Sequence, residues 1–427
     1  MNAVWTVSVE NTKESSHSKG MIASILLMIF LLYIRDIGGF AVNKYLFLAV
    51  AAVSVCALPI DKVMCFIAFV MPLYVGLPGN YMTMIFLVRF LLECRKLRFR
   101  ADILMLCLLA GGYAFIQSVV TNHTAISELM FFPGMILVMF MFSLDVRIEK
   151  SELILSYATG VAALGLIMLI HTLQFCDFGD LLTSTNRLGS VLRAQNNEMV
   201  INVDPNYYGL YCIALISLSV KFLNDNSRKS AGKISKTLMI LLTGICVAIG
   251  LIGLSRSFFL VMIAWLLLYL LSVKNVRAFL VSVSVILIAT VLVINFIPGV
   301  WNALNDRFSD STMATGNGRT ELIAKFHELW SATLSSMLFG VGIFDCNIHC
   351  MPLQVLYGGG LIFCILFVLY MIALLKNKNT WKNGGVVQKY LPLTMTIAMS
   401  CTVPALALIN IMYPITLAGF CMSGGEQ

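Results

Sequence analysis

The stretch LILSYATGVAALGLIMLIHTL runs from Leu153 to Leu173 and contains no Asp, Glu, Lys or Arg. A helix of about 20 apolar residues is long enough to cross the hydrocarbon core of a bilayer. Comparable apolar stretches recur along most of the chain. Because backbone groups in lipid must be hydrogen-bonded within the protein, we expect each such stretch to be a helix.

The composition agrees with a chain that lies mostly in lipid. Of its 427 residues, 59% are hydrophobic and only 12% are charged, whereas a soluble protein carries about 25% charged residues. The formal net charge of +8 would suggest nucleic-acid binding in a soluble protein. In a membrane protein it is explained by basic cytoplasmic loops, so we expect no nucleic-acid partner.

We predict an all-α, polytopic integral membrane protein with about 12–14 transmembrane helices. Residues 1–20 are polar and are expected to form a cytoplasmic tail, followed by a single transmembrane helical domain over 21–427. The spans are expected near 21–34, 45–60, 63–78, 81–92, 103–120, 126–144, 153–173, 207–222, 237–254, 257–273, 278–297, 354–375, 390–409 and 411–422.

Placing the N-terminus in the cytoplasm puts most of the 29 Lys and Arg residues on the inner side, as the positive-inside rule requires. Two outer connections, 174–206 and 298–353, are longer than simple connectors, so we expect function there. The basic residues on the outer side run against the charge bias and are candidates to bind an anion. They are Arg35, Lys44, Arg187, Arg193, Arg256, Arg307, Arg319 and Lys325.

Arg256 lies in GLSRSFF, a turn so short that two apolar spans nearly touch. One interpretation is an anchor that extends its side chain to the lipid headgroups. The other is a cation that grips a lipid-linked phosphate, since the planar guanidinium donates two parallel hydrogen bonds to phosphate oxygens.

Arg319 follows Gly318 and precedes apolar residues at helical spacing, which predicts an amphipathic helix over about 319–335 on the outer membrane face. A cation in the first turn of a helix is disfavoured by the helix dipole. Its position is explained if an anion such as phosphate binds at the helix N-terminus. Pairing with an acid such as Asp310, or with a lipid phosphate, explains it equally well.

The segment FDCNIHCMPLQ places Cys346, His349 and Cys350 close together just before a span. A zinc site would need a further ligand, such as Cys176 or His171, from another loop. A Cys346–Cys350 disulfide is a second interpretation and would require specific geometry. The third is that the cysteines only pack, and that His349 is the residue that takes part in chemistry.

Arg187 and Arg193 lie six residues apart in the first long outer loop. They are candidates to hold sugar hydroxyls or phosphate, and solvated charges are an equally good interpretation. The chain contains no GxxxxGK[ST] phosphate-binding loop, so an ATP-driven pump is not indicated.

In order and spacing, these features resemble the bacterial O-antigen polymerase and O-antigen ligase superfamily. That family has a membrane-helix body, a short turn with an Arg between two spans, and a long outer loop that ends in a His before a Gly-containing span. The corresponding stretches cover about residues 200–375; they are DPNYYGL, LSRSFF with Arg256, GNGRTELIAKFHELW with Arg319, FGVGIF with Gly340 and Gly342, and IHCMPLQVLYGGGLIFCILF with His349 and Gln354. The family often has Asn after the His, where this chain has Cys350.

The resemblance implies a membrane-embedded, metal-independent glycosyltransferase of the GT-C type that needs no cofactor. It would invert the anomeric centre while polymerising polyprenyl-pyrophosphate-linked repeat units at the outer face of the bacterial inner membrane. His349 would then be the general base, and Arg256 and Arg319 would grip the pyrophosphate; Arg187, Arg193 and Arg307 are further candidates for the glycan or the second chain. A flippase and a chain-length regulator of the same pathway are the expected protein partners.

Two alternatives remain at this point. A ligase, which transfers the finished glycan to a lipid core or a protein, would use the same residues. A flippase or transporter would need a polar path at mid-membrane, for which Arg89 in FLVRFLLE is the candidate.

Overall fold

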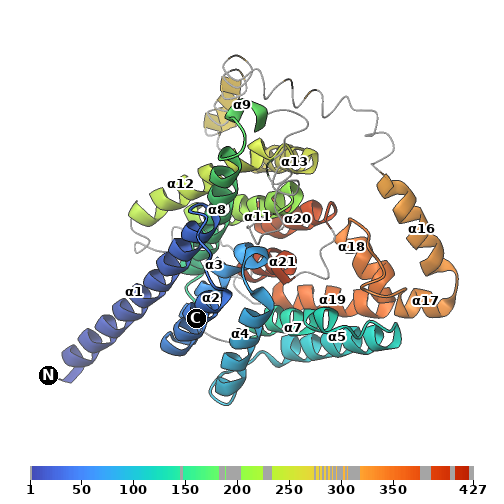
Figure 1. Cartoon of the computed structure of the whole chain (residues 1–427), viewed down its shortest axis with the longest axis horizontal. Coiled ribbons are helices and arrows are strands. Elements are labelled where there is room, and N and C mark those ends of the chain that lie inside the picture. The colour runs from blue at the N-terminus through green and yellow to red at the C-terminus, as the bar shows by residue number, and fades with distance from the viewer. Residues whose placement is uncertain are drawn as a thin grey trace.

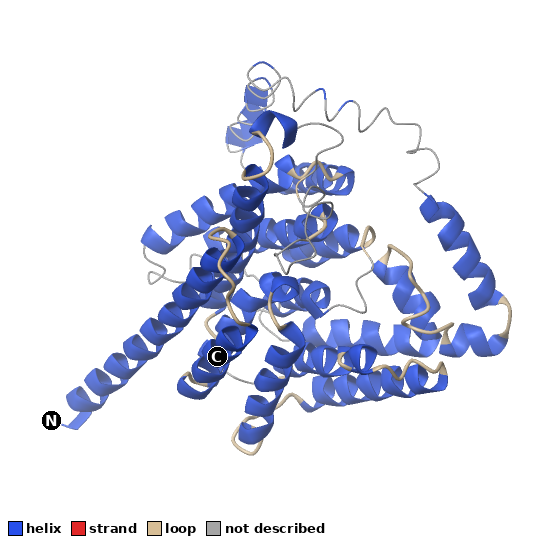
Figure 2. Cartoon of the chain, viewed as in Figure 1, coloured by secondary structure: helices blue, strands red, loops and turns tan. Residues whose placement is uncertain are grey.

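The computed structural model describes residues 2–144, 148–181, 188, 203–224, 233–273, 318–375, 386–403 and 409–422, together with scattered residues between 276 and 305. Within these ranges the chain is helical and contains no strand (Figure 2). One isolated antiparallel bridge joins Phe99 to Leu144. The predicted all-α class is therefore confirmed for the described part of the chain.

The first half of the chain forms a run of helices that begins with the longest one. They are α1 (Asn2–Asp36), α2 (Lys44–Ala57), α3 (Ile60–Leu73), the short η1 (Tyr74–Gly76), α4 (Gly79–Glu93), α5 (Ala101–Val120), α6 (Ile126–Leu129), α7 (Phe131–Met141), α8 (Lys150–Leu173) and α9 (Phe178–Leu181).

The second half contributes both bundle helices and the helices of the second long loop. They are α11 (Pro205–Asn224), α12 (Lys233–Ile252), α13 (Arg256–Ser272), α16 (Arg319–Ser331), α17 (Leu334–Phe339), α18 (Met351–Leu353), the π-helical turn η4 (Gln354–Gly358), α19 (Gly359–Leu375), α20 (Val386–Ser400) and α21 (Ile409–Met422).

Six described helices are long and apolar enough to cross a membrane: His17–Asp36, Ala101–Val120, Lys150–Leu173, Pro205–Leu223, Ile234–Ile252 and Met351–Leu375. This confirms a polytopic helical membrane protein, with fewer full-length spans in the described ranges than the 12–14 expected. Some expected spans are shorter apolar helices in the structure, such as Lys44–Ala57, Phe131–Met141 and Arg256–Ser272. The span expected at 278–297 lies mostly outside the described residues.

Helix α1 contains most of the expected tail as well as the first span, since residues 2–20 continue without a break into the stretch that ends at Asp36. The amphipathic helix begins at Arg319 as expected but ends at Ser331 instead of 335. Thr333 and Ser336 form a reciprocal capping box there, which starts the separate helix α17.

Helix α3 is the centre of the bundle and packs most extensively against α8. Every residue of α3 except Asp61 is buried. A Cβ atom at Gly160 of α8 would collide with the backbone carbonyl of Phe69, so glycine is what allows the two backbones to approach this closely. At the end of the pair where both helices begin, Lys62 forms an ion pair with Glu152.

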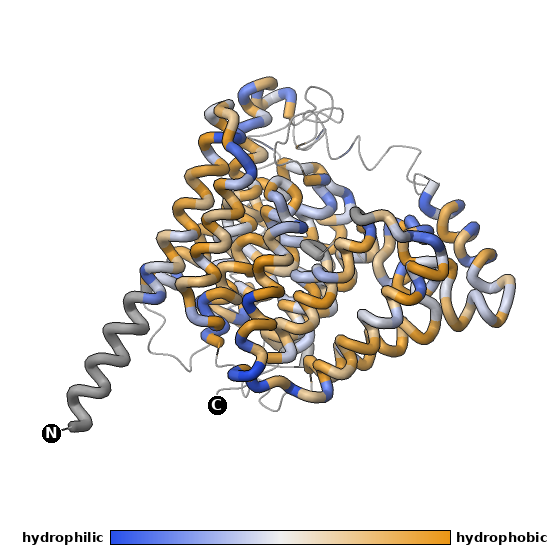
Figure 3. The backbone as a smooth tube through the Cα atoms, turned by 60° about the horizontal axis from the view of Figure 1, so that its bottom comes forward, coloured by the Kyte–Doolittle hydropathy of each residue, from blue (hydrophilic) through white to orange (hydrophobic). Residues whose placement is uncertain are grey.

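The helices α5, α7 and α19 lie side by side at one end of the bundle (Figure 1). Hydrophobic residues run along most of the bundle helices (Figure 3). The helix α16 stands at the edge of the molecule and connects through α17 to the start of α19 (Figure 1). The second long loop is therefore attached to the bundle where the α19 span begins.

Replacing Gly160 with Ala should lower the free energy of unfolding by about 1–3 kcal/mol, because the added methyl group overpacks the α3–α8 contact. The matched control is Gly112→Ala in α5, where an added Cβ meets nothing within 4 Å. That variant should be neutral or stabilising by up to about 1 kcal/mol. Thermal unfolding of both proteins in the same detergent measures the difference, and equal midpoints would contradict the assigned contact.

Candidate functional site

Two glycine-containing stretches that the sequence analysis singled out lie against each other. The backbone N–H of Val341 donates to the carbonyl of Tyr357 at 2.9 Å, and that of Gly342 donates to Gly358 at 3.1 Å. Gly340 has a φ of +79°, and a Cβ at this position would collide with the Gly358 carbonyl. The stretches FGVGIF and YGGG therefore form a backbone contact, and this contact fixes the start of the α19 span.

Helix α5 reinforces this contact with two polar side chains. The Tyr113 hydroxyl lies 3.0 Å from the carbonyl oxygens of both Phe339 and Gly359. The buried Gln117 amide donates to the carbonyls of Phe339 and Gly358. These carbonyls lie at the end of α17 and in the π-helical turn, where regular helical hydrogen bonding is interrupted. The α5 side chains satisfy groups that would otherwise be costly to bury.

The segment that carries His349 is thus held at both ends, by Gly342 before it and by α18 after it. Its middle packs on α16 through a small apolar cluster of Phe326, Cys346, Ile348 and Tyr357. We expected the apolar face of this helix to lie on the membrane; in the structure, part of it covers the His349 segment. This packing places the first turn of α16 close to His349.

His349 is exposed by surface area, yet protein atoms on one side desolvate the imidazole and lower its pKa below the usual value of 6.5. The positive charge of Arg319 lowers the pKa further, and the negative charge of Asp204 opposes both effects. The His349 imidazole is therefore neutral near pH 7 and able to accept a proton. Three segments far apart in the sequence meet at this histidine.

Asp204 belongs to the DPN turn that begins α11. A side-chain hydrogen bond joins this turn to the turn that begins α13. Its carboxylate accepts a hydrogen bond from the backbone N–H of Asn206 at 2.9 Å. The Ser255 hydroxyl donates to the Asn206 side-chain oxygen at 2.7 Å and accepts from the backbone of Phe258, which caps α13. Arg256 is the first residue of that helix, so the turn that carries Arg256 lies next to the turn that carries Asp204.

A second histidine contacts the same segment. The Nε2 atom of His123 lies 2.8 Å from Asp345, and its Nδ1 atom lies 3.2 Å from Glu128. The carboxylate of Asp345, followed by that of Glu128, raises the His123 pKa above 6.5. Phe344, next to Asp345, packs edge-on against Phe131. His123 thus links the α5–α6 connection to the segment that carries His349.

The cysteines of this segment have different surroundings. Cys346 is fully buried in the apolar cluster, and desolvation raises the pKa of its thiol to about 12. Cys350 is half-buried, and its thiol lies beside that of Cys401 at the end of α20. All described cysteines are free thiols, and no group of three or more metal-ligating side chains occurs among the residues that the structure describes. The thiol next to Cys350 is thus that of Cys401 and not that of Cys346.

The structure brings together only part of the residues predicted from the sequence. Arg319 and His349 interact electrostatically, and Arg256 begins a helix that is hydrogen-bonded to the Asp204 turn. Arg187, Arg193 and Arg307 lie outside the described residues. Three neighbours of the site were not predicted from the sequence: Asp204, Cys401 and His123. Asp204 was expected only as a turn or cap residue. Nothing in the local sequence of these residues indicates their distant partners.

The candidate for a transport path, Arg89, has a local partner. Its guanidinium lies 2.8 Å from Glu93 one turn along α4, and it also donates to the carbonyl of Leu58 at 3.3 Å. These two contacts connect Arg89 to the ends of α2 and α4.

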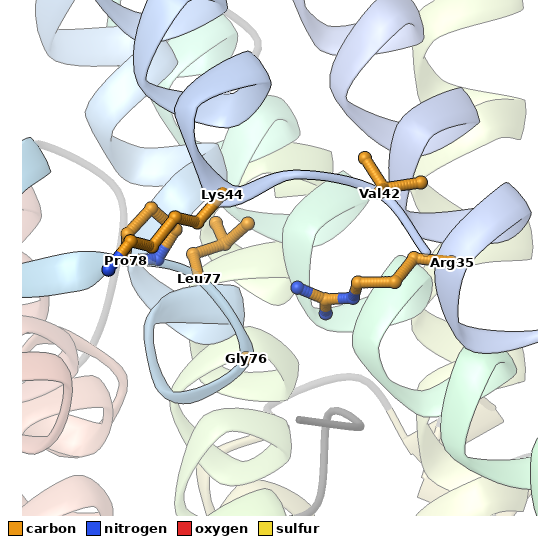
Figure 4. Close-up of a pocket in the computed structure, with 6 residues that line it drawn as sticks. All are labelled: Arg35, Val42, Lys44, Gly76, Leu77 and Pro78. Carbon is orange, nitrogen blue, oxygen red and sulfur yellow. The ribbon is translucent and has the colours of Figure 1, made fainter. Parts of the chain in front are cut away.

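A separate pocket of about 250 Å³ is lined by Arg35, Val42, Lys44, Gly76, Leu77 and Pro78. Figure 4 shows the Arg35 side chain reaching from the end of α1 toward the turn at Gly76. Its guanidinium forms a two-pronged ion pair with Asp36, with contacts of 2.6 and 2.8 Å. The charge of Arg35 is thus balanced by its neighbour, and the elements that line this pocket are not those around His349.

Comparison with known proteins adds no relative. No protein-family model matches the chain, and no curated protein matches it.

The His123 ion pairs should stabilise the protein most at low pH. Because the folded-state pKa of His123 is raised, this stabilisation is fully present below the unfolded value of about 6.5 and is lost as the pH rises through the folded-state value. His123→Gln should therefore lower the unfolding midpoint at about pH 6 and have little effect well above the raised pKa. Asp345→Asn should give the same pH dependence, and a pH-independent effect of both variants would contradict the ion pair.

Proposed function

We propose that this protein is an inverting, metal-independent glycosyltransferase that polymerises polyprenyl-pyrophosphate-linked oligosaccharide units in the bacterial inner membrane. The proposal includes a GT-C type architecture, a cytoplasmic N-terminus and a site on the outer face. The observation that carries it is the neutral histidine at the head of a membrane span, with Arg319 and Asp204 acting on it from two other segments. The resemblance of LSRSFF, GNGR and the His349 segment to the O-antigen polymerase and ligase superfamily adds to it.

The chemistry requires a base and a leaving group. The acceptor hydroxyl attacks the anomeric carbon of the donor sugar while the bond from that carbon to the pyrophosphate oxygen breaks. Attack from the side opposite the leaving group inverts the anomeric centre. His349 takes the proton of the attacking hydroxyl, as a neutral imidazole can. The departing pyrophosphate carries the negative charge that develops, and Arg319 and Arg256 stabilise it.

Arg319 has two effects on this reaction. In the free protein its charge holds His349 neutral, so the base is not lost to protonation. When a pyrophosphate binds, its negative charge offsets that of Arg319, which raises the pKa of His349 and makes it a stronger base. The site therefore gains basicity only when the substrate is present.

The surroundings of His349 suit a lipid-linked substrate. The histidine lies two residues before the membrane-spanning stretch Met351–Leu375, so a polyprenyl chain can remain in the bilayer while its headgroup reaches the imidazole. His349 and Asn347 are both exposed, which leaves room for a glycan beside the imidazole.

His349→Ala should reduce chain elongation by about 10²–10⁴-fold, because the variant lacks the general base. Purified protein in lipid vesicles, supplied with a synthetic polyprenyl-pyrophosphate repeat unit, provides the assay, with product length read by gel electrophoresis. His327→Ala, on the α16 helix that also carries Arg319, is the matched control and should retain activity. Normal polymer from the His349 variant would overturn the proposal. Accumulation of single-unit glycan after deletion indicates a polymerase, whereas long unattached polymer indicates a ligase.

Arg319→Gln should shift the acidic limb of the pH–activity profile toward higher pH, in addition to lowering the maximal rate. The positive charge of Arg319 depresses the His349 pKa, so its removal lets the imidazole protonate at a higher pH. Asp204→Asn, which keeps an oxygen able to cap Asn206, should shift the limb in the opposite direction. If both variants leave the limb in place, His349 is not the titrating base.

A further inference from the structure

The thiols of Cys350 and Cys401 form a pair that the proposed glycosyl transfer does not use. Cys350 is the cap residue of α18 and follows His349, whereas Cys401 follows the last residue of α20. The Ser400 hydroxyl, which precedes Cys401, donates to the sulfur of Met351, which follows Cys350, at 3.9 Å. This contact places the end of α20 against the start of α18, so the two thiols lie close enough for each to shift the ionisation of the other.

From this pairing we propose that Cys350 and Cys401 are a modification site, at which they form a reversible disulfide that ties the His349 segment to the end of α20. Two thiols on segments that already touch can reach bonding distance when their side chains rotate toward each other. The bond would close a loop between two segments that already pack, so the backbone need not rearrange. This inference rests on the geometry of the thiols and does not require the proposed function.

The two sulfur atoms differ in reactivity in the way such a reaction needs. The neighbouring Cys401 thiol, then the backbone N–H of Leu353 and the charge of Arg319, lower the pKa of Cys350 to about 7 against the effect of burial. Cys350 is thus partly a thiolate near neutral pH, which is the nucleophilic form. Cys401 is exposed, so its thiol can attack the mixed disulfide in the second step. Cys346 is buried and its thiol stays protonated, so it is a poor competitor.

The reaction balances with a low-molecular-weight disulfide as the oxidant. The Cys350 thiolate attacks one sulfur of that disulfide and releases one thiolate, leaving a mixed disulfide on Cys350. Cys401 then loses its proton and attacks the Cys350 sulfur, which releases the second small thiolate. The protein loses two thiols, and one small disulfide is reduced to two thiols. An outer-face location in the bacterial membrane would expose the pair to an oxidising compartment.

The test uses the full chain in detergent micelles, treated with oxidised glutathione, with the remaining thiols then blocked by a maleimide. Peptide mapping should find Cys350 linked to Cys401, and the link should disappear after dithiothreitol. Cys401→Ser should stop at the first step and keep one glutathione on Cys350. Cys176→Ser, at a half-buried cysteine outside the pair, is the control and should form the link normally.

Three results in the wild-type protein would overturn the inference: a stable glutathione adduct on Cys350, a Cys346–Cys350 link, or no reaction at either thiol. The mapping needs no enzymatic activity. Failure of the glycosyltransferase assay therefore leaves this test intact, and failure of the disulfide leaves the assay intact.

Discussion

The geometry of the His349 region depends on one close backbone contact, in which the stretch after α17 lies directly against the π-helical turn that begins the α19 span. The contact has no room for a Cβ at Gly340, and it is held by backbone hydrogen bonds from Val341 and Gly342. Tyr113 and Gln117 of α5 bind the carbonyls on both sides of it. The seven residues between Gly342 and Cys350 are consequently anchored at both ends, which restricts where His349 can lie.

The charges around this anchored segment are arranged in two groups with opposite effects on histidine. On one side His349 faces a cation and is desolvated, so it stays neutral. On the other side His123 lies between two carboxylates, so its protonated form is favoured. Two histidines that serve the same short segment are therefore in surroundings that favour opposite charge states. One is suited to accept a proton, and the other to hold the segment in place.

Much of the fold could be predicted from the sequence, because a stretch such as Leu153–Leu173 can satisfy its backbone in lipid only as a helix. The start of α16 at Arg319 was also predictable from its apolar spacing. Local competition decided the rest: the Thr333–Ser336 capping box ended α16 early, although the apolar spacing continued. The partners Asp204, Cys401 and Asp345 were not predictable, because contacts between distant segments depend on how the helices pack and leave no local pattern.

The anchoring of the His349 segment also has a consequence for biogenesis. Its supports come from α5, which is synthesised long before the segment, and from α20, which is synthesised after it. A ribosome-bound chain that has just exposed His349 has its α5 contacts within reach and still lacks its α20 neighbour. Completion of the site is therefore coupled to insertion of the C-terminal helices, so a truncated or stalled chain would carry the histidine without its full surroundings.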